Sequence, residues 1–381
     1  MIKFIPLFFV SFSLHAAPCK DLIAKMLEHY PNQDTQKILL RFQNAKNKHM
    51  FMRAFVPYYY KEAFDVKETL PIYQKLKNHR GQIVGDAHAE NFGFIVSNKG
   101  VPKFTFNDFD DVAEAPLFLD VMRLSQSASY MGDFKQEKFI EAYKMGLAGT
   151  KRPYSPYVQE LQAKAQKGGH ASKADVLETA QGPRFKVKGE PNFALAPKEK
   201  ASVEKVFKDK FGAKTKVHDV YRTMKESGGS AFGNRYHALV EINGKIEFIE
   251  LKQIMDGGVV GWTKNINDKK RVETSMKKFL GNDFNQRLDV VDVGTKPYQM
   301  RFKIEGNKSI DSADLSEKDM GKVIEDEFYL LGQLHRTSLG GTTKNVSAYA
   351  KDLETVTTED WETSVKVMKK TLKKAYEDSG K

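Results

Sequence analysis

Two short acidic stretches lie close together between hydrophobic runs, and they limit what this chain can fold into. The stretch "VGDAHAENFGF" (84–94) carries two carboxylates, a His and an Asn, and "FTFNDFDDV" (104–112) adds three Asp. Burying so much unpaired negative charge is costly, so such groups are normally paired or bound to a cation. We therefore expect the two stretches to meet at one site that a cation or a basic ligand shares.

The residue types in these stretches favour a hard metal ion and phosphate chemistry. Asp86 and Asn91 lie on an expected loop, and Asp108 follows an expected strand. Mg²⁺ prefers carboxylate and amide oxygens, which Asn91 and Asp108 can supply. A general base followed by two oxygen ligands on neighbouring loops is an arrangement that positions Mg²⁺ and a phosphate acceptor.

The N-terminus is typical of an exported protein. "MIKFIPLFFVSFSLHAAPCK" has one Lys, an apolar run and then small residues, as in a secretory signal peptide. We expect residues 1–17 to be removed and the protein to be periplasmic, with no membrane span left; a buried N-terminal helix is the alternative. Cys19 is the single cysteine, so a disulfide framework within the chain is excluded. Lipid anchoring through Cys19 is a minor alternative that the preceding "AAP" disfavours.

The charge balance is basic, with a formal net charge of +12 over 381 residues. Such a balance suits nucleic acid, phosphate ligands or an anionic membrane surface. Lys and Glu are interleaved almost everywhere, however, and aromatic residues are not gathered among the Lys. We therefore expect a generally basic surface and no nucleic-acid partner.

The hydrophobic pattern predicts an α+β fold in four parts. Residues 18–150 are mostly helical, with a short strand entering the first acidic stretch and a hairpin between the two stretches. Residues 151–214 have weak periodicity and are predicted to be a basic, partly flexible insert. Residues 215–305 alternate as strands, with an Asn-Gly turn at 243–244 and a helix around 268–280. Residues 306–381 return to helices.

The acidic motifs resemble known families. "GDAHAEN" is similar to the G-D-x-H-x-x-N catalytic loop of aminoglycoside and choline kinases, and "NDFDDVAEAPLFLDVMRL" is similar to their metal-binding segment. This resemblance implies that Asp86 is the catalytic Asp and that Asn91 and Asp108 hold Mg²⁺. It also implies that Asp120 and Arg123 form a structural pair on the following helix.

A closer resemblance is to an uncharacterised bacterial family, domain of unknown function 2252. The motifs that carry it are "FMRAF" (51–55), "GDAHAENFG" (85–93), "NDFD" (107–110) and "DVMRL" (120–124). The likeness covers about residues 40–130 well and residues 215–340 more loosely.

The candidate nucleotide-binding residues follow the catalytic loop instead of preceding it. The Gly-rich "SGGSAFGN" lies between expected strands and would bring backbone N–H groups close to phosphates. Lys252 lies within a later strand and would pair with nucleotide phosphates, and Glu273 on the next helix would hold Lys252. The candidate residues are Gly228, Gly229, Ser230, Gly233, Lys252 and Glu273. Taken singly, a hairpin loop explains the glycines equally well, whereas a solvent-facing Lys and a solvated helix charge explain Lys252 and Glu273 better.

This order predicts a protein kinase-like, two-lobed fold that is circularly permuted. The helix ending "LLGQLHRTSL" resembles the one that directly precedes the catalytic loop in aminoglycoside kinases, but it lies near the C-terminus here. The expected function is an ATP- and Mg²⁺-dependent phosphotransferase with an unknown acceptor. The alternatives are an exported kinase-shaped binding module without catalysis, a nucleotidyl transferase and, last, a metal-dependent phosphoesterase, which usually needs several His ligands.

Overall fold

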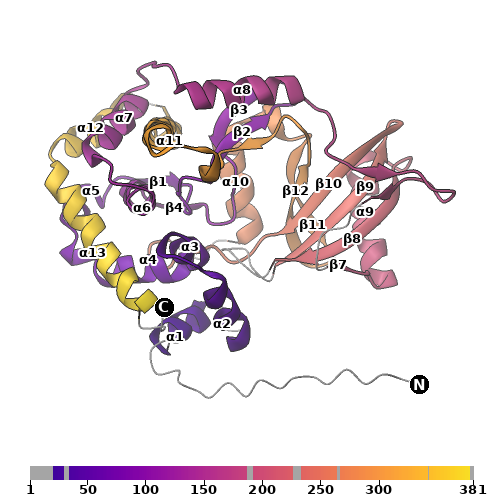
Figure 1. Ribbon diagram of the computed structural model, residues 1–381, viewed down its shortest axis with the longest axis horizontal. Coiled ribbons are helices and arrows are strands. Elements are labelled where there is room, and N and C mark those ends of the chain that lie inside the picture. Colours follow the sequence, from indigo (N-terminus) through magenta and orange to yellow (C-terminus); the bar gives the residue numbers. More distant parts are fainter. Residues whose placement is uncertain are drawn as a thin grey trace.

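The chain forms a helical body next to a six-stranded antiparallel sheet (Figure 1). The computed structural model describes residues 20–29, 34–186, 192–225, 233–263, 267–341 and 343–377. The predicted signal peptide (1–17) and Cys19 lie outside the described residues, as do Gly228, Gly229 and Ser230. The predicted α+β class is confirmed, and within the described ranges no helix is long and apolar enough to span a bilayer.

Helices from both ends of the chain make up the body. They are α1 (Lys20–His29), α2 (Thr35–Asn44), α3 (Lys48–Ala54), α4 (Val56–Asp65), α5 (Pro71–Leu76), α6 (Phe118–Ala128), α7 (Gln136–Ala148), α8 (Pro156–Gly168), α11 (Glu317–Ser338), α12 (Thr343–Glu354) and α13 (Thr358–Glu377), with 3₁₀ turns at Lys67–Thr69 and Ser312–Asp314. Two small antiparallel sheets lie among them: β1 (Arg80–Ile83) with β4 (Ala113–Pro116), and β13 (Lys308–Ser309) with β2 (Phe92–Val96) and β3 (Pro102–Phe106). The pairing of β2 with β3 confirms the predicted hairpin between the acidic stretches.

The late helix α11 packs against elements from the first third of the chain. It lies along α7, where the rings of Phe139 and Phe328 stack 5.0 Å apart, and it also contacts β1 and α6. The apolar stripe of α11 recurs every three or four residues, at Ile324, Phe328 and Leu331, as an amphipathic helix requires. The chain therefore returns, after building the sheet, to support the strand that enters the first acidic stretch.

The large sheet has the order β11-β12-β10-β9-β8-β7, and each neighbouring pair is antiparallel. Its strands are β7 (Asn192–Phe193), β8 (Lys216–Met224), β9 (Asn234–Ile242), β10 (Lys245–Gln253), β11 (Leu288–Val293) and β12 (Lys296–Phe302). Asn243 and Gly244 both have positive φ, 52° and 78°, which confirms the predicted tight turn between β9 and β10.

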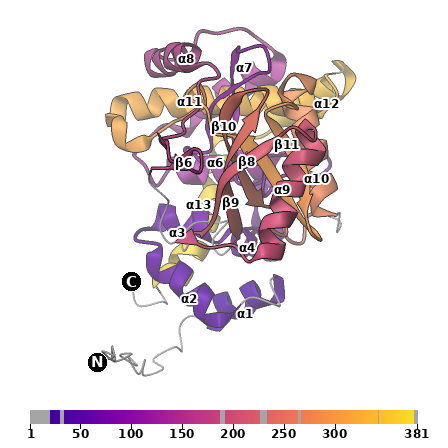
Figure 2. The same cartoon turned by 90° about the vertical axis from the view of Figure 1, so that its right-hand side faces the viewer.

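The two faces of this sheet differ in chemistry because alternate residues point to opposite sides. Ala238, Ile249, Leu251 and Met300 join one hydrophobic cluster with side chains of α9 (Pro197–Phe211). Figure 2 shows α9 lying across this outer face. The other face looks toward the body and carries the polar residues that alternate with this cluster.

Residues 151–214 are built into both halves, so the described part of this segment is not a loose insert. It supplies α8, the short hairpin of β5 (Val176–Leu177) and β6 (Arg184–Phe185), β7 and α9. The periodicity is weak because α9 buries only Val203, Val206 and Phe207 among many Lys. This segment passes from the body to the sheet beside the stretch of chain that follows β12 back to the body, since Glu305 N donates to Ala171 O over 2.7 Å.

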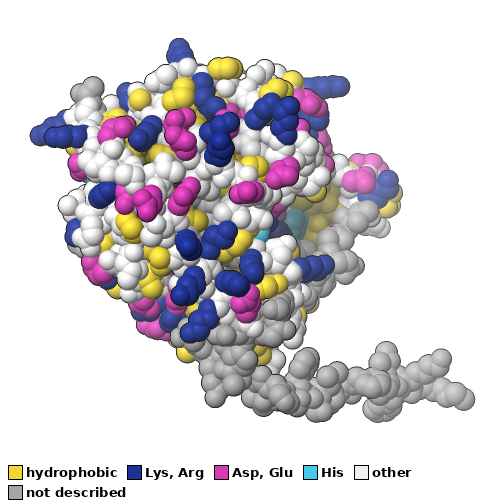
Figure 3. Space-filling view, turned by 60° about the vertical axis from the view of Figure 1, so that its left-hand side comes forward, with side chains coloured by type: hydrophobic (Ala, Val, Ile, Leu, Met, Phe, Trp, Pro, Cys, Tyr) yellow, Lys and Arg dark blue, Asp and Glu magenta, His cyan; other side chains and the backbone are white. Residues whose placement is uncertain are grey.

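The segment after β10 attaches the sheet to the body. The Trp262 indole N–H donates to Tyr60 O over 3.0 Å, and the ring meets Phe64 and Phe118 edge-on. The helix α10 (Asp268–Leu280) and the turn at Asn282–Phe284 follow, and their apolar side chains join the core of the body. On the face seen in Figure 3, Lys and Arg are interspersed with Asp and Glu, and the surface is hollowed where the two halves meet.

Candidate functional site

A buried carboxylate on α6 fixes the first acidic loop. Asp120 accepts hydrogen bonds from the backbone N–H groups of Val84 (2.7 Å) and Gly85 (2.9 Å). Its other contact is His335 of α11, whose Nε2 lies 3.0 Å from Asp120 Oδ2. Gly85 has φ 77°, and a Cβ there would lie 1.9 Å from Asp111 O, so the turn into the loop requires glycine.

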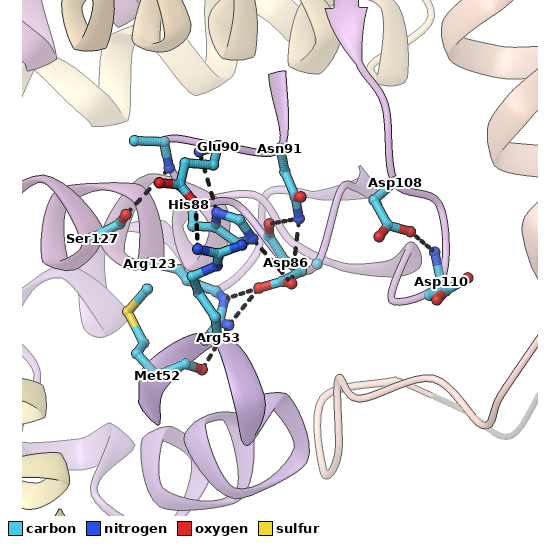
Figure 4. A network of polar contacts seen from close by, with 12 residues as sticks. Met52, Arg53, Asp86, His88, Glu90, Asn91, Asp108, Asp110, Arg123 and Ser127 are labelled. Carbon is cyan, nitrogen blue, oxygen red and sulfur yellow. Dashed lines mark hydrogen bonds and ion pairs between the residues drawn. The ribbon is translucent and has the colours of Figure 1, made fainter. Parts of the chain in front are cut away.

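The Asp86 carboxylate, which the sequence singles out as catalytic, is held by a buried guanidinium. Arg123 donates to Asp86 Oδ1 from Nε (3.1 Å) and Nη2 (2.5 Å), as Figure 4 shows. Burial opposes ionisation, but Arg123 and His88 outweigh it and hold the pKa of Asp86 well below its usual range. Asp86 is therefore ionised, still 13% exposed, and a weak base.

His88 serves to orient Asp86. Its Nδ1 accepts the backbone N–H of Glu90 over 3.2 Å, so the proton of the neutral ring is on Nε2. That nitrogen lies 3.5 Å from Asp86 Oδ2. Burial lowers the pKa of His88, which keeps the ring neutral. The side chain is a hydrogen-bonded part of the loop, in keeping with an ordinary structural His.

The two acidic loops run side by side. Asn107 N donates to Asn91 O over 3.0 Å, and the Asn91 amide donates to Asp86 O (3.1 Å) and Asp86 Oδ2 (3.3 Å). These bonds use the Nδ2 group of Asn91 and leave its amide oxygen for another partner. Figure 4 shows Asn91 directly above Asp86, and Asp108 to the right of both on a neighbouring backbone segment.

Lys252 of the large sheet meets the second acidic loop. Its ammonium lies 2.8 and 2.9 Å from the two oxygens of Asp108 and 2.7 Å from Asp110 Oδ2. The Lys252 side chain is 2% exposed, so this amine is removed from solvent and paired. The fold thus brings Lys252 and Asp108, 144 residues apart in the sequence, into direct contact. Asp110 is the second partner of Lys252.

Glu273 does not hold Lys252, and that prediction is wrong. The Glu273 side chain is exposed on α10, and Lys252 forms its ion pairs with Asp108 and Asp110 of the acidic loop. The residue of α10 that reaches the loop is Arg271, which donates to Val112 O (2.9 Å) and Met255 O (3.0 Å) and also bonds Asp110 O. Hydrophobic periodicity could have revealed this, because Val272, Met276 and Phe279 define the buried face and Glu273 lies off it.

Gly233 is buried immediately before β9, two residues before Arg235, which pairs with Lys252. The other three predicted residues of the Gly-rich turn, Gly228, Gly229 and Ser230, lie outside the described residues. A phosphate-binding role for this turn therefore stays a prediction.

A group of basic residues lies on the body-facing side of the sheet, and sequence reasoning missed it. Glu250 is buried between Arg301, which donates to it from Nε, and Arg235, whose Nη1 is 3.6 Å away. Burial opposes ionisation of Glu250, but Arg301, Lys303 and Arg235 hold its pKa well below the usual range. The signal was the alternation of β9, β10 and β12, which puts these residues on the face of Lys252.

A cavity of about 180 Å³ opens between this basic group and the acidic loop. Asp108, Arg301 and Lys303 are in its lining, together with Lys173, Arg287 and Lys308. A wider cavity of about 820 Å³ lies on the body beside His49, whose ring meets that of His88 edge-on. Across the residues that the structure describes, no group of three or more His, Cys, Asp and Glu is arranged to hold a metal ion.

Comparison with known proteins identifies a family for part of the chain. Residues 33–145 match the model of a family described as "Uncharacterized protein conserved in bacteria (DUF2252)". This match covers both acidic stretches and α6, and it confirms the resemblance to that family over this segment. No curated protein and no solved structure matches the chain.

Proposed function

We propose that this protein is an ATP- and Mg²⁺-dependent phosphotransferase with a kinase-like site. The observation that carries the proposal is the contact of the buried Lys252 amine with Asp108 and Asp110, beside Asp86 and Asn91. Phosphoryl transfer needs an amine for the phosphates, oxygen ligands for a metal and a carboxylate that positions the acceptor. All three kinds of group converge at one junction between the sheet and the body.

The ligand set suits a metal that arrives with phosphates. Mg²⁺ in phosphoryl-transfer sites is commonly held by one or two carboxylates together with substrate phosphate oxygens, without an all-protein cage. Asp108, through its carboxylate, and Asn91, through its amide oxygen, would hold it. The ion would supply charge neutralisation for the phosphates. Lys252 would then exchange its carboxylate partners for phosphate oxygens.

Asp86 would position the acceptor hydroxyl more than activate it. Its low pKa makes early proton removal unfavourable, whereas the loose transition state of phosphoryl transfer asks little of a base. The bond between the terminal phosphorus and its bridging oxygen breaks as the acceptor oxygen bonds to that phosphorus. The acceptor proton passes to Asp86 and then to water. Positioning would therefore supply most of the rate.

The order of the elements supports a permuted arrangement of a two-lobed kinase-like fold. The half with the catalytic loop comes first in the chain, the half with Lys252 comes second, and α11 then returns beneath the loop. In a permuted fold, α11 should pack beneath the catalytic loop although it comes later in the chain. The contact of His335 on α11 with Asp120, the residue that holds the loop, agrees with this arrangement.

A kinase-shaped binding module without catalysis is the second candidate. The two hydrogen bonds from Arg123 to Asp86 favour it, because they occupy one carboxylate oxygen and weaken Asp86 as a base. Nucleotidyl transfer is a further variant of the enzyme hypothesis, in which the α-phosphorus reacts instead of the terminal one.

The test is thermal stabilisation of the full chain by ATP with Mg²⁺. We expect the melting temperature to rise by about 5 °C at a ligand concentration 100 times Kd, and Asp108→Ala to lose most of this rise. Asp292→Ala, which removes an exposed carboxylate of β11, is the matched control and should keep it. No rise in the folded wild type would contradict the proposal.

Labelled ATP then separates the candidates. Transfer of the γ-phosphate indicates a phosphotransferase, transfer of the α-phosphate a nucleotidyl transferase, and binding without transfer a silent module. Asp86→Asn should abolish either transfer, and an unchanged rate in this variant would remove Asp86 from its proposed role.

A further inference from the structure

The basic group on the sheet holds more positive charge than its own carboxylate balances. Arg235, Arg301 and Lys303 surround the single carboxylate of Glu250. Lys225 adds another cation nearby, and its pKa is lowered, first by Arg235 and then by burial. Cations held close together repel one another, and a bound anion removes this cost.

Lys303 is the residue that most clearly lacks a partner. Burial lowers its pKa from 10.5 to about 8, so the ammonium is still charged at neutral pH. Among the residues that the structure describes, no hydrogen bond or ion pair reaches Lys303 Nζ. This ammonium lines the cavity that has Asp108 in its wall. A charged group in such a position is expected to meet an anionic ligand.

The cavity is small for a whole nucleotide. Its volume of about 180 Å³ is below the roughly 300–1,000 Å³ of usual cofactor sites. Its polar lining is dominated by cations, since Lys173, Arg287 and Lys308 join Arg301 and Lys303. Apolar residues line it as well, but the rings among them, Phe94, Phe284 and Phe302, are only 2%, 4% and 5% exposed because they belong to the hydrophobic clusters. The polar side chains of the cavity therefore offer a ligand mainly positive charge.

The sheet also offers little to a flat aromatic base. Base sites use apolar or aromatic walls, with few polar groups. On the described strands next to Lys252, the body-facing positions are Arg235, His237, Glu250, Gln299 and Arg301, while the apolar residues between them face α9. The His237 ring is already stacked on Tyr221, with the ring centroids 4.9 Å apart. A base placed here would lie against charges that are already hydrogen-bonded.

We propose that the phosphate donor is recognised through its triphosphate chain, by Lys303 and Arg301 together with Lys252, and that its base contributes little. The ligand class is therefore triphosphates in general, inorganic tripolyphosphate included. This inference rests on the proposed function, which puts the phosphates beside Lys252 and Asp108.

The experiment compares four ligands with the full-length folded protein in the presence of Mg²⁺. ATP, GTP and inorganic tripolyphosphate should bind with Kd values within about threefold of one another, and adenosine should not bind. Lys303→Gln should weaken all three phosphate ligands by about tenfold, the effect of one charged hydrogen bond. Lys296→Gln, which removes an exposed charge at the far end of β12, is the control and should change none of them.

Each contrary outcome points to a different error. If ATP binds more than tenfold more tightly than GTP and tripolyphosphate, or if adenosine binds alone, the base is recognised and this inference is overturned while the proposed function stands. If Lys303→Gln, with an unchanged melting temperature without ligand, binds all three like the wild type, Lys303 is not part of the site. If none of the three phosphate ligands binds, the proposed function itself fails. Binding of tripolyphosphate without ATP supports the inference and removes ATP as the donor.

Discussion

The acidic loops and the basic face of the sheet meet at one cavity, yet their charges are treated in opposite ways. In the loops, Asp86, Asp108 and Asp120 each have cationic or N–H partners at hydrogen-bond distance within the protein. On the sheet, Arg235 and Arg301 lie beside the buried carboxylate of Glu250, but no hydrogen bond or ion pair within the described residues reaches Lys303 Nζ. The difference indicates that these three carboxylates have partners in the folded chain, whereas Lys303 on the sheet gains a partner at hydrogen-bond distance only when an anion binds.

The largest effect on stability should come from removing Asp120, which holds the first acidic loop in place. Asp120→Ala leaves two buried N–H groups and His335 without their partner, so we expect the free energy of unfolding to fall by about 3–5 kcal/mol. Urea denaturation measures it. Asp352→Ala removes an acid from a His79 pair in which Asp352 is 48% exposed, and it should cost less than about 1 kcal/mol. Equal losses in the two variants would show that Asp120 does not carry the loop.

A smaller effect tests how the body holds the second acidic loop. Arg271→Gln breaks charged hydrogen bonds to Val112 O and Met255 O and should cost about 2–3 kcal/mol. Glu273→Gln, two residues away on the exposed face of α10, should stay within about 0.5 kcal/mol of the wild type. The same denaturation measurement applies to both. The reverse ranking would restore Glu273 as the residue that matters on α10.

The smallest effect on stability concerns Lys303 on the basic face of the sheet and depends on pH. The folded pKa of Lys303 is about 8 and its usual value 10.5, so the unfolded chain binds more protons between these values. The buried charge of Lys303 therefore lowers the free energy of unfolding below pH 8, and this destabilisation decreases as the pH rises above 8. Between pH 7 and 9, the free energy of unfolding should rise by about 1 kcal/mol more in the wild type than in Lys303→Gln. Equal changes in the two proteins would mean that Lys303 is not perturbed.

The acidic side could be predicted because its signals are local. Asp86, Asn91 and Asp108 belong to short motifs with fixed spacing, and the strand–loop–hairpin around them follows from alternation and turn residues. Lys252 was singled out from its place in an alternating strand. The partner of Asp86 was not predicted, because a motif does not say which of the neighbouring charged side chains will turn toward it.

The remaining errors share one physical origin, which is the orientation of an element. Glu273 was chosen by its distance along the chain, although the helical period turns it away from the face of Val272 and Met276. The group of Arg301 and Lys303 was missed because the cross-strand register, which puts Arg301 opposite Glu250, becomes visible only when the strands are paired. In α9 a narrow apolar stripe among many Lys hid a packed helix.

The Trp262 side chain has a mechanical consequence. It is 6% exposed in the core of the body and only ten residues after Lys252. It therefore limits how far the end of β10 can move away from the body. Wide separation of the two halves would have to draw an indole out of an aromatic cluster. We therefore expect a ligand to reach Asp108 through the cavity that Asp108 and Lys303 line, while the two halves stay together.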